Sequence, residues 1–259
     1  MIPMPRPLPY ADPDARPQFT LAGEAVHEFY AGAGTRSMAM TGGVLALMHL
    51  AKRGPKLWVR HVALDREYGA PYAAGLAEFG VDPAQVILVR TPDVTGALQA
   101  GLEGARCHGL GAVMIELWGE AKAYDLTASR RLVLAAKASG ISVFITRMAA
   151  TPHASAAETR WLIHPAPSRA LAARAPGHPL FDLTLLRTRH GREDLRYLVE
   201  WDRDVRDLVI HSVVTIADSV IDDRAGIDGA APLSRAVAAL PVNRPGMPGI
   251  EPAAQQHSR

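Results

Sequence analysis

The chain has 259 residues, of which 48% are hydrophobic and 21% charged, and its formal net charge is +2. A chain of this kind can bury one full core, and without a stretch of about 18 uninterrupted apolar residues we expect no membrane span. The small net charge neither requires nor excludes nucleic acid as a partner, because a local basic patch matters more than the total.

Both ends of the sequence have a composition that disfavours a packed core. Residues 1–20 form a Pro-rich extension without the apolar segment of a secretory signal, and residues 226–259 are rich in Ala and Pro, so we expect a flexible tail there. The single cysteine, Cys107, excludes an internal disulfide framework and is typical of the reducing cytoplasm.

Between these ends, short β-rich runs alternate with helical patterns. The expected strands are residues 27–30, 57–62, 86–90, 112–117 and 142–148. The expected helices run from Met40 to Gly54, over residues 70–80, from Val94 to near Gly109, and over residues 127–140, with Gly140 as the stop of the last. Apolar strands separated by helices favour an α/β fold with a mainly parallel sheet covered on both faces.

The C-terminal part has a different pattern. Residues 159–164 fit one more strand, and residues 181–189 and 195–201 fit an antiparallel hairpin that turns near Gly191. A long helix is expected over residues 205–225. Its apolar stripe consists of Val205, Leu208, Val209, Val213, Ile216 and Val220. This stripe must be covered by the chain's own core, by a sister copy in a homo-oligomer, or by a partner that takes the helix into a groove.

The segment YAGAGTRSMAMTGGVLALM, residues 30–48, has the position of a phosphate-binding loop but not its residues. Such a loop reads Gly-x-x-x-x-Gly-Lys-Ser/Thr, so that backbone amides and a lysine hold phosphate while the hydroxyl holds magnesium. Here Gly32 and Gly34 are followed by Arg36 and Ser37, without a lysine. An arginine fork does not fit where a compact ammonium sits, so we expect a degenerate loop: a plain turn or an altered anion site.

An ATP-hydrolysing site also needs carboxylates at the ends of neighbouring strands. Glu116 ends an expected strand where a magnesium-orienting acid would lie, but His61 ends another where an acid would polarise water. We therefore expect no catalytic residue and no cofactor.

Basic side chains mark one candidate contact surface. Arg130 and Arg131 open an expected helix, Lys137 shares a face with Arg130, and Arg147 ends the following strand. This surface could contact a DNA backbone or acidic groups of a partner protein, or it could simply be solvated. Contact with DNA would show as a steep salt dependence of binding.

The remaining candidates are assigned structural roles. All of the tryptophans fall in or beside strand runs, which predicts core packing: Trp58, Trp118, Trp161 and Trp201. The ten histidines do not show the spacing of metal ligands, so we assign no metal site.

Four segments taken in order resemble one family. HEFYAGAG, PAQVILVRTPD, LTASRRLVLAAKASGISVFITR and FDLTLLRTRHG are similar to ImuA, the RecA-like accessory protein of a damage-induced mutagenesis cassette. The resemblance covers residues 21–204 and is most specific at LTASRRLVLAA. It implies a RecA-like domain in which Gly32 and Gly34 match the start of the nucleotide loop, Glu116 matches the Walker B acid, and His61 replaces the catalytic glutamate.

The resemblance also implies a function. It indicates a non-catalytic adaptor in SOS-induced, error-prone translesion DNA synthesis, cytoplasmic and associated with the nucleoid. The implied partners are ImuB, which is a Y-family-like protein, RecA and, indirectly, an error-prone replicative-type polymerase. Two other functions stay open: an ATP-dependent, DNA-binding filament or motor protein with a deviant loop, and a SulA-like division inhibitor that binds a cytoskeletal GTPase.

Overall fold

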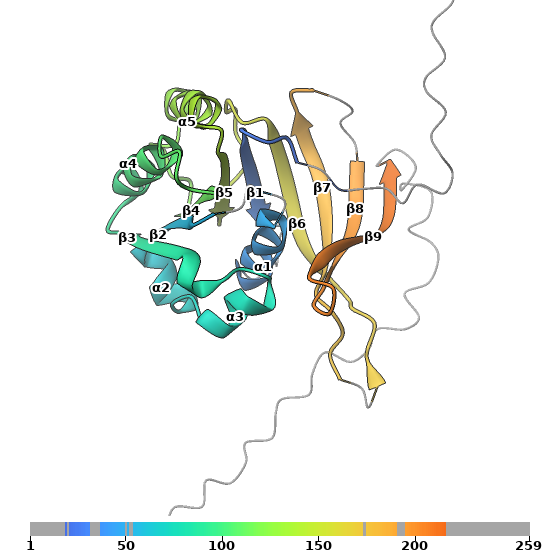
Figure 1. Cartoon of the computed structure of the whole chain (residues 1–259). Helices are drawn as coiled ribbons and strands as arrows, with labels where there is room; N and C mark the ends of the chain where they lie inside the picture. Colours follow the sequence, from blue (N-terminus) through green and yellow to red (C-terminus); the bar gives the residue numbers. More distant parts are fainter. Residues whose placement is uncertain are drawn as a thin grey trace, which may run out of the picture. The chain divides into compact units, whose positions relative to one another are not determined.

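Nine strands form one sheet in the computed structural model, which describes residues 19, 21–31, 37–49, 51, 54–172, 175–190 and 195–215 (Figure 1). The strands are β1 (Val26–Ala31), β2 (Lys56–His61), β3 (Val86–Thr91), β4 (Ala112–Trp118), β5 (Ser142–Met148), β6 (Thr159–Ala166), β7 (Leu180–Thr188), β8 (Leu195–Asp202) and β9 (Asp207–Thr215). The helices are α1 (Ser37–Met48), α2 (Val62–Tyr68), α3 (Ala73–Glu78), α4 (Val94–Ala105) and α5 (Leu126–Ser139), with a short 3-10 turn η1 (Pro83–Gln85).

The sheet has a parallel half and an antiparallel half. Its strand order is β3-β2-β4-β5-β1-β6-β7-β8-β9. From β3 to β6 in this order neighbouring strands run parallel, and from β6 to β9 they run antiparallel. Strands β1, β2, β4 and β5 are almost wholly buried, as continuous apolar runs in a parallel sheet require. The mixed α/β sheet flanked by helices agrees with the sequence.

Helices cover both faces of the parallel half, so the sheet separates two hydrophobic core clusters. One cluster joins the sheet to α1, α2 and α3, and the other joins it to α4 and α5 (Figure 1). Alternation along a strand sends neighbours to opposite clusters: Trp58 packs on the α1 face, whereas Leu57 and Val59 pack on the α4–α5 face.

Capping side chains mark the starts of α4 and α5, and a glycine marks the end of α5. Asp93 and Asp125 cap them by accepting hydrogen bonds from the backbone N–H groups of Gly96 and Ala128, at 2.7 Å in each case. Gly140 ends α5 with a φ of 71°, a left-handed conformation that favours glycine. Gly140 confirms the stop expected from the sequence, whereas α4 ends at Ala105, before the expected end near Gly109.

The expected helix over residues 205–225 is wrong for the part that the structure describes. Asp207–Thr215 instead form the edge strand β9, paired with β8. Val205, Val209 and Val213 recur at helical spacing, but in β9 a bulge puts Val209 and Val213 on opposite faces of the sheet. Val209 pairs with Glu200 and Val213 with Tyr197, three residues apart on β8. The β-branched run decides in favour of the strand.

The other residues of the expected apolar stripe lie in different parts of the structure. Val205 lies in the exposed turn between β8 and β9, Leu208 packs against the α1-face cluster, and Ile216 and Val220 lie outside the described residues. Residues 226–259, the Pro-rich stretch before Phe19 and the hairpin turn at Gly191 also lie outside them.

The remaining elements agree with the sequence apart from one omission. The strands β6, β7 and β8 confirm the extra strand and the hairpin expected from the pattern. Helix α2 was not expected. Trp58, Trp161 and Trp201 are buried in the core, as expected, whereas Trp118 is partly exposed and packs against Tyr68.

Candidate functional site

The degenerate loop follows β1 at the carboxyl edge of the parallel strands. In open α/β sheets, ligand crevices form at this edge. Gly32, Gly34 and Arg36 lie outside the described residues, and Ser37 is the first residue of α1. The described part of the site therefore begins on α1 and on the ends of β2 and β4.

Glu116, the expected Walker B-like acid, is fully buried near the end of β4 on the α1 face. Its Oε1 accepts a hydrogen bond from the Thr41 hydroxyl at 2.9 Å. Its Oε2 accepts from the Trp58 indole N–H at 2.8 Å and from Nη1 of Arg60 at 2.7 Å. Arg60 and Glu116 lie opposite each other on the paired strands β2 and β4. Both carboxylate oxygens are thus held by side chains of the protein.

Arg60 links Glu116 to α2 and to its C-cap, Gly69. Its Nη2 donates to the carbonyl of Gly69 at 3.0 Å, and its Nε lies 2.7 Å from Oδ1 of Asp65 as an ion pair without the angle of a hydrogen bond. The other oxygen of Asp65 pairs with Arg90 at 2.6 Å. The guanidinium of Arg60 therefore supplies the positive charge beside Glu116.

The protonation of Glu116 reflects two opposing effects. Burial raises the pKa of Glu116 because it penalises the carboxylate, while the charge of Arg60 and the three hydrogen bonds lower it. Burial prevails. Both oxygens of Glu116 already accept hydrogen bonds from the protein, so the group has a structural role. Binding a metal through it would require breaking contacts with Arg60 or Trp58.

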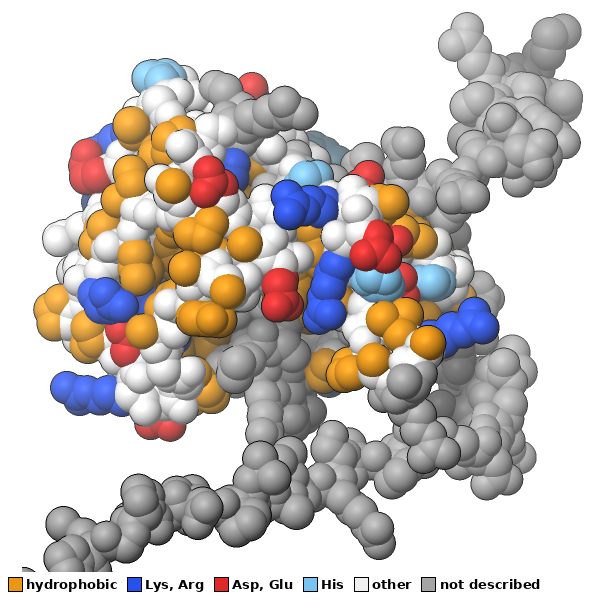
Figure 2. All heavy atoms as spheres, turned by 60° about the horizontal axis from the view of Figure 1, so that its bottom comes forward, with side chains coloured by type: hydrophobic (Ala, Val, Ile, Leu, Met, Phe, Trp, Pro, Cys, Tyr) orange, Lys and Arg blue, Asp and Glu red, His pale blue; other side chains and the backbone are white. Residues whose placement is uncertain are grey.

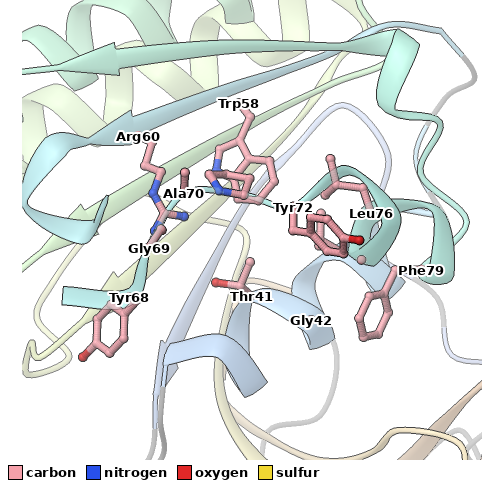
Figure 3. Close-up of a pocket in the computed structure, with 13 residues that line it drawn as sticks. Thr41, Gly42, Trp58, Arg60, Tyr68, Gly69, Ala70, Tyr72, Leu76 and Phe79 are labelled. Carbon is pink, nitrogen blue, oxygen red and sulfur yellow. The ribbon is translucent and has the colours of Figure 1, made fainter. Parts of the chain in front are cut away.

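Above this network lies a pocket of about 230 Å³ between α1 and the α2–α3 segment (Figure 3). It is lined by Thr41, Gly42, Leu45, Trp58, Arg60, Tyr68, Gly69, Ala70, Pro71, Tyr72, Gly75, Leu76 and Phe79. Tyr72 stands at its rim with 75% of its surface exposed. Figure 2 views the molecule from this side and shows hydrophobic side chains exposed between scattered charged ones.

The chemistry of this pocket favours binding over catalysis. Its walls are mainly aromatic and aliphatic, and its polar groups Thr41, Trp58 and Arg60 already contact Glu116. Its volume is below the roughly 300 Å³ typical of pockets for drug-sized ligands. It suits a single apolar or aromatic group, such as one side chain of a partner.

His61, the expected substitute for a catalytic glutamate, ends β2 and precedes α2. Its Nδ1 is buried and has no hydrogen-bond partner among the described residues. His61 does not line the pocket. The structure therefore separates it from the apolar cavity over Glu116.

Arg147, expected at the basic surface, is fully buried instead. Alternation along β5 turns it to the α4–α5 face, where it lies between the rings of Tyr30 and Tyr124, at 5.6 and 5.2 Å from their centroids. Its Nη2 donates to the carbonyl of Glu120 at 2.7 Å. Arg147 is thus part of the core, and the expected surface keeps Arg130, Arg131 and Lys137, all exposed on α5.

Glu28 holds this second buried cluster together. It accepts hydrogen bonds from the Tyr124 hydroxyl at 2.6 Å and from Nε of Arg160 at 2.8 Å. Burial and the charge of Glu28 raise the pKa of Tyr124 well above its usual value, so its phenol stays a donor. The cluster carries two arginines and one carboxylate, all closed off from solvent or nearly so.

One group of residues has the composition of a metal site. His178, Asp202 and Asp204 place one potential ligand atom each within 4.8 Å of one another. Nδ1 of His178 accepts a hydrogen bond from the backbone N–H of Arg203 at 3.1 Å, so Nε2 carries the proton and faces the carboxylates. An Nε2 that carries the proton of the neutral ring cannot bind a metal, and we interpret the group as a polar cluster at the β8–β9 turn.

The sequence did not identify the pocket. Tyr68, Tyr72 and Phe79 alternate with the glycines Gly69 and Gly75 in the segment after β2, and this density of aromatic residues and glycines was the available signal. No model of a known protein family matches the chain, and no curated protein matches it. None of the described helices is long and apolar enough to cross a membrane.

Proposed function

We propose that the chain is a RecA-like, non-catalytic adaptor of the ImuA type, acting in SOS-induced error-prone translesion DNA synthesis. It would work at the nucleoid by binding an ImuB-like Y-family protein, RecA or both. The resemblance of four sequence segments to ImuA is the reason for proposing this family. The observed parallel sheet that continues into antiparallel strands is compatible with it.

The observation that carries the proposal is that both carboxylate oxygens of Glu116 are hydrogen-bonded by side chains of the protein. In nucleotide-hydrolysing enzymes of this architecture, an acid at this position orients magnesium. Here the same carboxylate is fully buried and contacts a protein cation at 2.7 Å. The position that would orient magnesium in such enzymes is taken by an internal ion pair, which supports a role in binding rather than in hydrolysis.

The apolar pocket gives the adaptor a place to hold a partner. Protein interfaces gain much of their binding energy where a side chain of one partner fills a desolvated pocket of the other. Tyr72 at the rim and Phe79 in the wall offer such a pocket. We place the principal contact with the ImuB-like protein or RecA here.

The test combines nucleotide and partner binding. Calorimetric titration with Mg-ATP, alone and with single-stranded DNA, should give no heat at millimolar nucleotide. Micromolar binding that is lost in Arg36→Ala would overturn the proposal and favour a working variant loop.

Partner binding is measured with purified ImuB-like protein and RecA, with the division GTPase as a comparison. Tyr72→Ala should weaken binding to the ImuB-like protein or RecA by about tenfold or more. Leu171→Ala is the matched control, because Leu171 is also an exposed apolar side chain but lies outside the pocket. Binding to the division GTPase instead would favour the SulA-like alternative.

A further inference from the structure

The outer face of α5 combines basic and apolar side chains. Its members, called the α5 face here, are Leu126, Arg130, Arg131, Leu134 and Lys137, and all are exposed. Leu134 keeps 69% of its surface exposed and Leu126 keeps 40%. Leu126, Arg130 and Leu134 follow one another at i, i+4 spacing, so they form a line along the helix.

This face is not needed to hold α5 on the sheet. The opposite side of the helix packs into the core through Ser129, Leu132, Ala135, Ala136 and Ser139, all buried. The two leucines of the outer face therefore contribute apolar surface beyond what the fold uses. Exposed apolar residues grouped with charges are typical of interaction sites.

The cations of the α5 face lack counter-charges within the described chain. Arg130, Arg131 and Lys137 make no ion pair or side-chain hydrogen bond there, and α5 contains no acidic residue. The nearest helix does not supply one, because Glu103 of α4 pairs with Arg106 at 2.7 Å. Asp125 is engaged as the N-cap of α5.

A groove lies beside these cations, between α4 and α5. Its volume is about 160 Å³, and it is lined by Leu98, Leu102 and Leu132 together with small and polar residues. Arg131 belongs to the same lining. An apolar side chain in the groove and a carboxylate on Arg131 could therefore come from one short segment.

We infer that the α5 face and this groove form a docking surface for an acidic segment of a partner protein that carries large apolar side chains. The cations of the α5 face favour acidic groups on the partner, and the groove together with Leu134 favours apolar side chains. A DNA backbone would satisfy the cations but would leave Leu126, Leu134 and the groove without a contact. This surface lies on the opposite face of the sheet from the pocket over Glu116, so the inference does not depend on the proposed function.

The probe is a fluorescent peptide of about 14 residues, long enough for roughly four helical turns, with leucines at i, i+4 spacing and glutamates between them. Its binding to the full-length protein is measured by fluorescence anisotropy at low and high salt. A second peptide replaces every glutamate by glutamine, a third scrambles the order, and a labelled oligothymidine represents DNA.

Arg131→Glu and Leu134→Asp should each weaken binding of the acidic peptide by about tenfold or more. Arg66→Glu is the matched control, because Arg66 is an exposed arginine without a partner among the described residues, on α2 at the other face. The glutamine and scrambled peptides should bind more weakly. Absence of binding at millimolar peptide, equal losses in Arg66→Glu, or tighter binding of oligothymidine would each overturn the inference.

Discussion

On each face of the sheet, a buried glutamate meets an arginine that lies opposite it on the neighbouring parallel strand. Glu116 meets Arg60 across β4 and β2, and Glu28 meets Arg160 across β1 and β6. Each glutamate also accepts a hydrogen bond from an aromatic side chain, Trp58 in the first case and Tyr124 in the second. The strand register therefore builds the same charge pair twice.

The two pairs differ in what surrounds them. Arg60 continues to Asp65 and Gly69 and lines an open pocket. Arg160 continues to Ser155, and its cluster includes Arg147, a second buried guanidinium without a carboxylate in hydrogen-bond contact. One pair thus forms the floor of a pocket, whereas the other is part of a closed core. Substitutions at Glu28 and at Arg60 can separate these roles.

The largest effect is expected at the closed cluster. Glu28→Leu would remove the carboxylate that pairs with Arg160 and would leave two buried guanidinium groups in an uncompensated cluster, so we expect the free energy of unfolding to fall by about 3–5 kcal/mol. Urea denaturation at neutral pH measures it. Glu103→Leu is the control, because it breaks only an exposed pair with Arg106. Equal losses in the two variants would show that Glu28 does not hold the cluster together.

At the pocket, Arg60→Met should cost less, about 3 kcal/mol, because Thr41 and Trp58 still donate to Glu116. The loss should depend on pH. Burial raises the pKa of Glu116 above its ordinary value of 4.5, so in the window above 4.5 the folded state holds a proton that the unfolded state has released. Stability from this group therefore falls as pH rises through the window and returns as pH falls.

Removing Arg60 takes away the charge that opposes this pKa shift. The deficit of Arg60→Met should accordingly be smaller at about pH 5 than at about pH 8. The double variant Arg60→Met with Glu116→Gln should lose this dependence on pH, because no carboxylate remains to titrate. A deficit that stays constant over the range would argue that Arg60 acts through packing alone.

A third effect concerns His27, which is fully buried in β1. Its Nε2 donates to the carbonyl of Ala22 at 2.9 Å, and its Nδ1 accepts from the hydroxyl of Thr159 at 2.8 Å. Burial lowers the pKa of His27 from 6.5, against the opposing effects of the Ala22 hydrogen bond and the charge of Glu158. The neutral ring suits both contacts.

A lowered pKa means that the unfolded chain binds a proton first as the solution becomes acidic. Stability should therefore fall below pH 6.5, with a slope of at most about 1.4 kcal/mol per pH unit from this residue. His27→Gln should reduce the slope in urea denaturation between about pH 6.5 and pH 5. An unchanged slope would assign the acid sensitivity to other groups.

The features that the sequence predicted depend on local signals, and those that it missed depend on contacts between distant residues. The stop at Gly140 and the apolar runs of β4 and β5 depend on near neighbours in the chain, and the structure confirms them. The burial of Arg147 depends on Tyr30 and Tyr124, which are distant in sequence. No local pattern distinguishes such an arginine from a surface one.

The site shows the same division. The sequence identified Glu116 as a strand-end acid, but its partner Arg60 is set by the register of β2 against β4, which only the assembled sheet reveals. The strand β9 was mistaken for a helix because its valines recur at helical spacing, whereas its bulge is set by the pairing with β8. Short apolar runs remain ambiguous until a pairing strand is known.

The smallest effect concerns the glycines that shape the pocket. A Cβ on Gly75 would lie 3.9 Å from Cδ1 of Tyr72, an ordinary contact, so Gly75→Ala should gain about 0.5–1 kcal/mol of stability from helix propensity. A Cβ on Gly42 would lie 2.9 Å from Cζ of Phe79, so Gly42→Ala must displace that ring. Thermal unfolding should rank Gly75→Ala above Gly42→Ala, although both add one methyl group to a helix. The reverse order would mean that the Phe79 ring moves freely and that the wall of the pocket is adaptable rather than fixed.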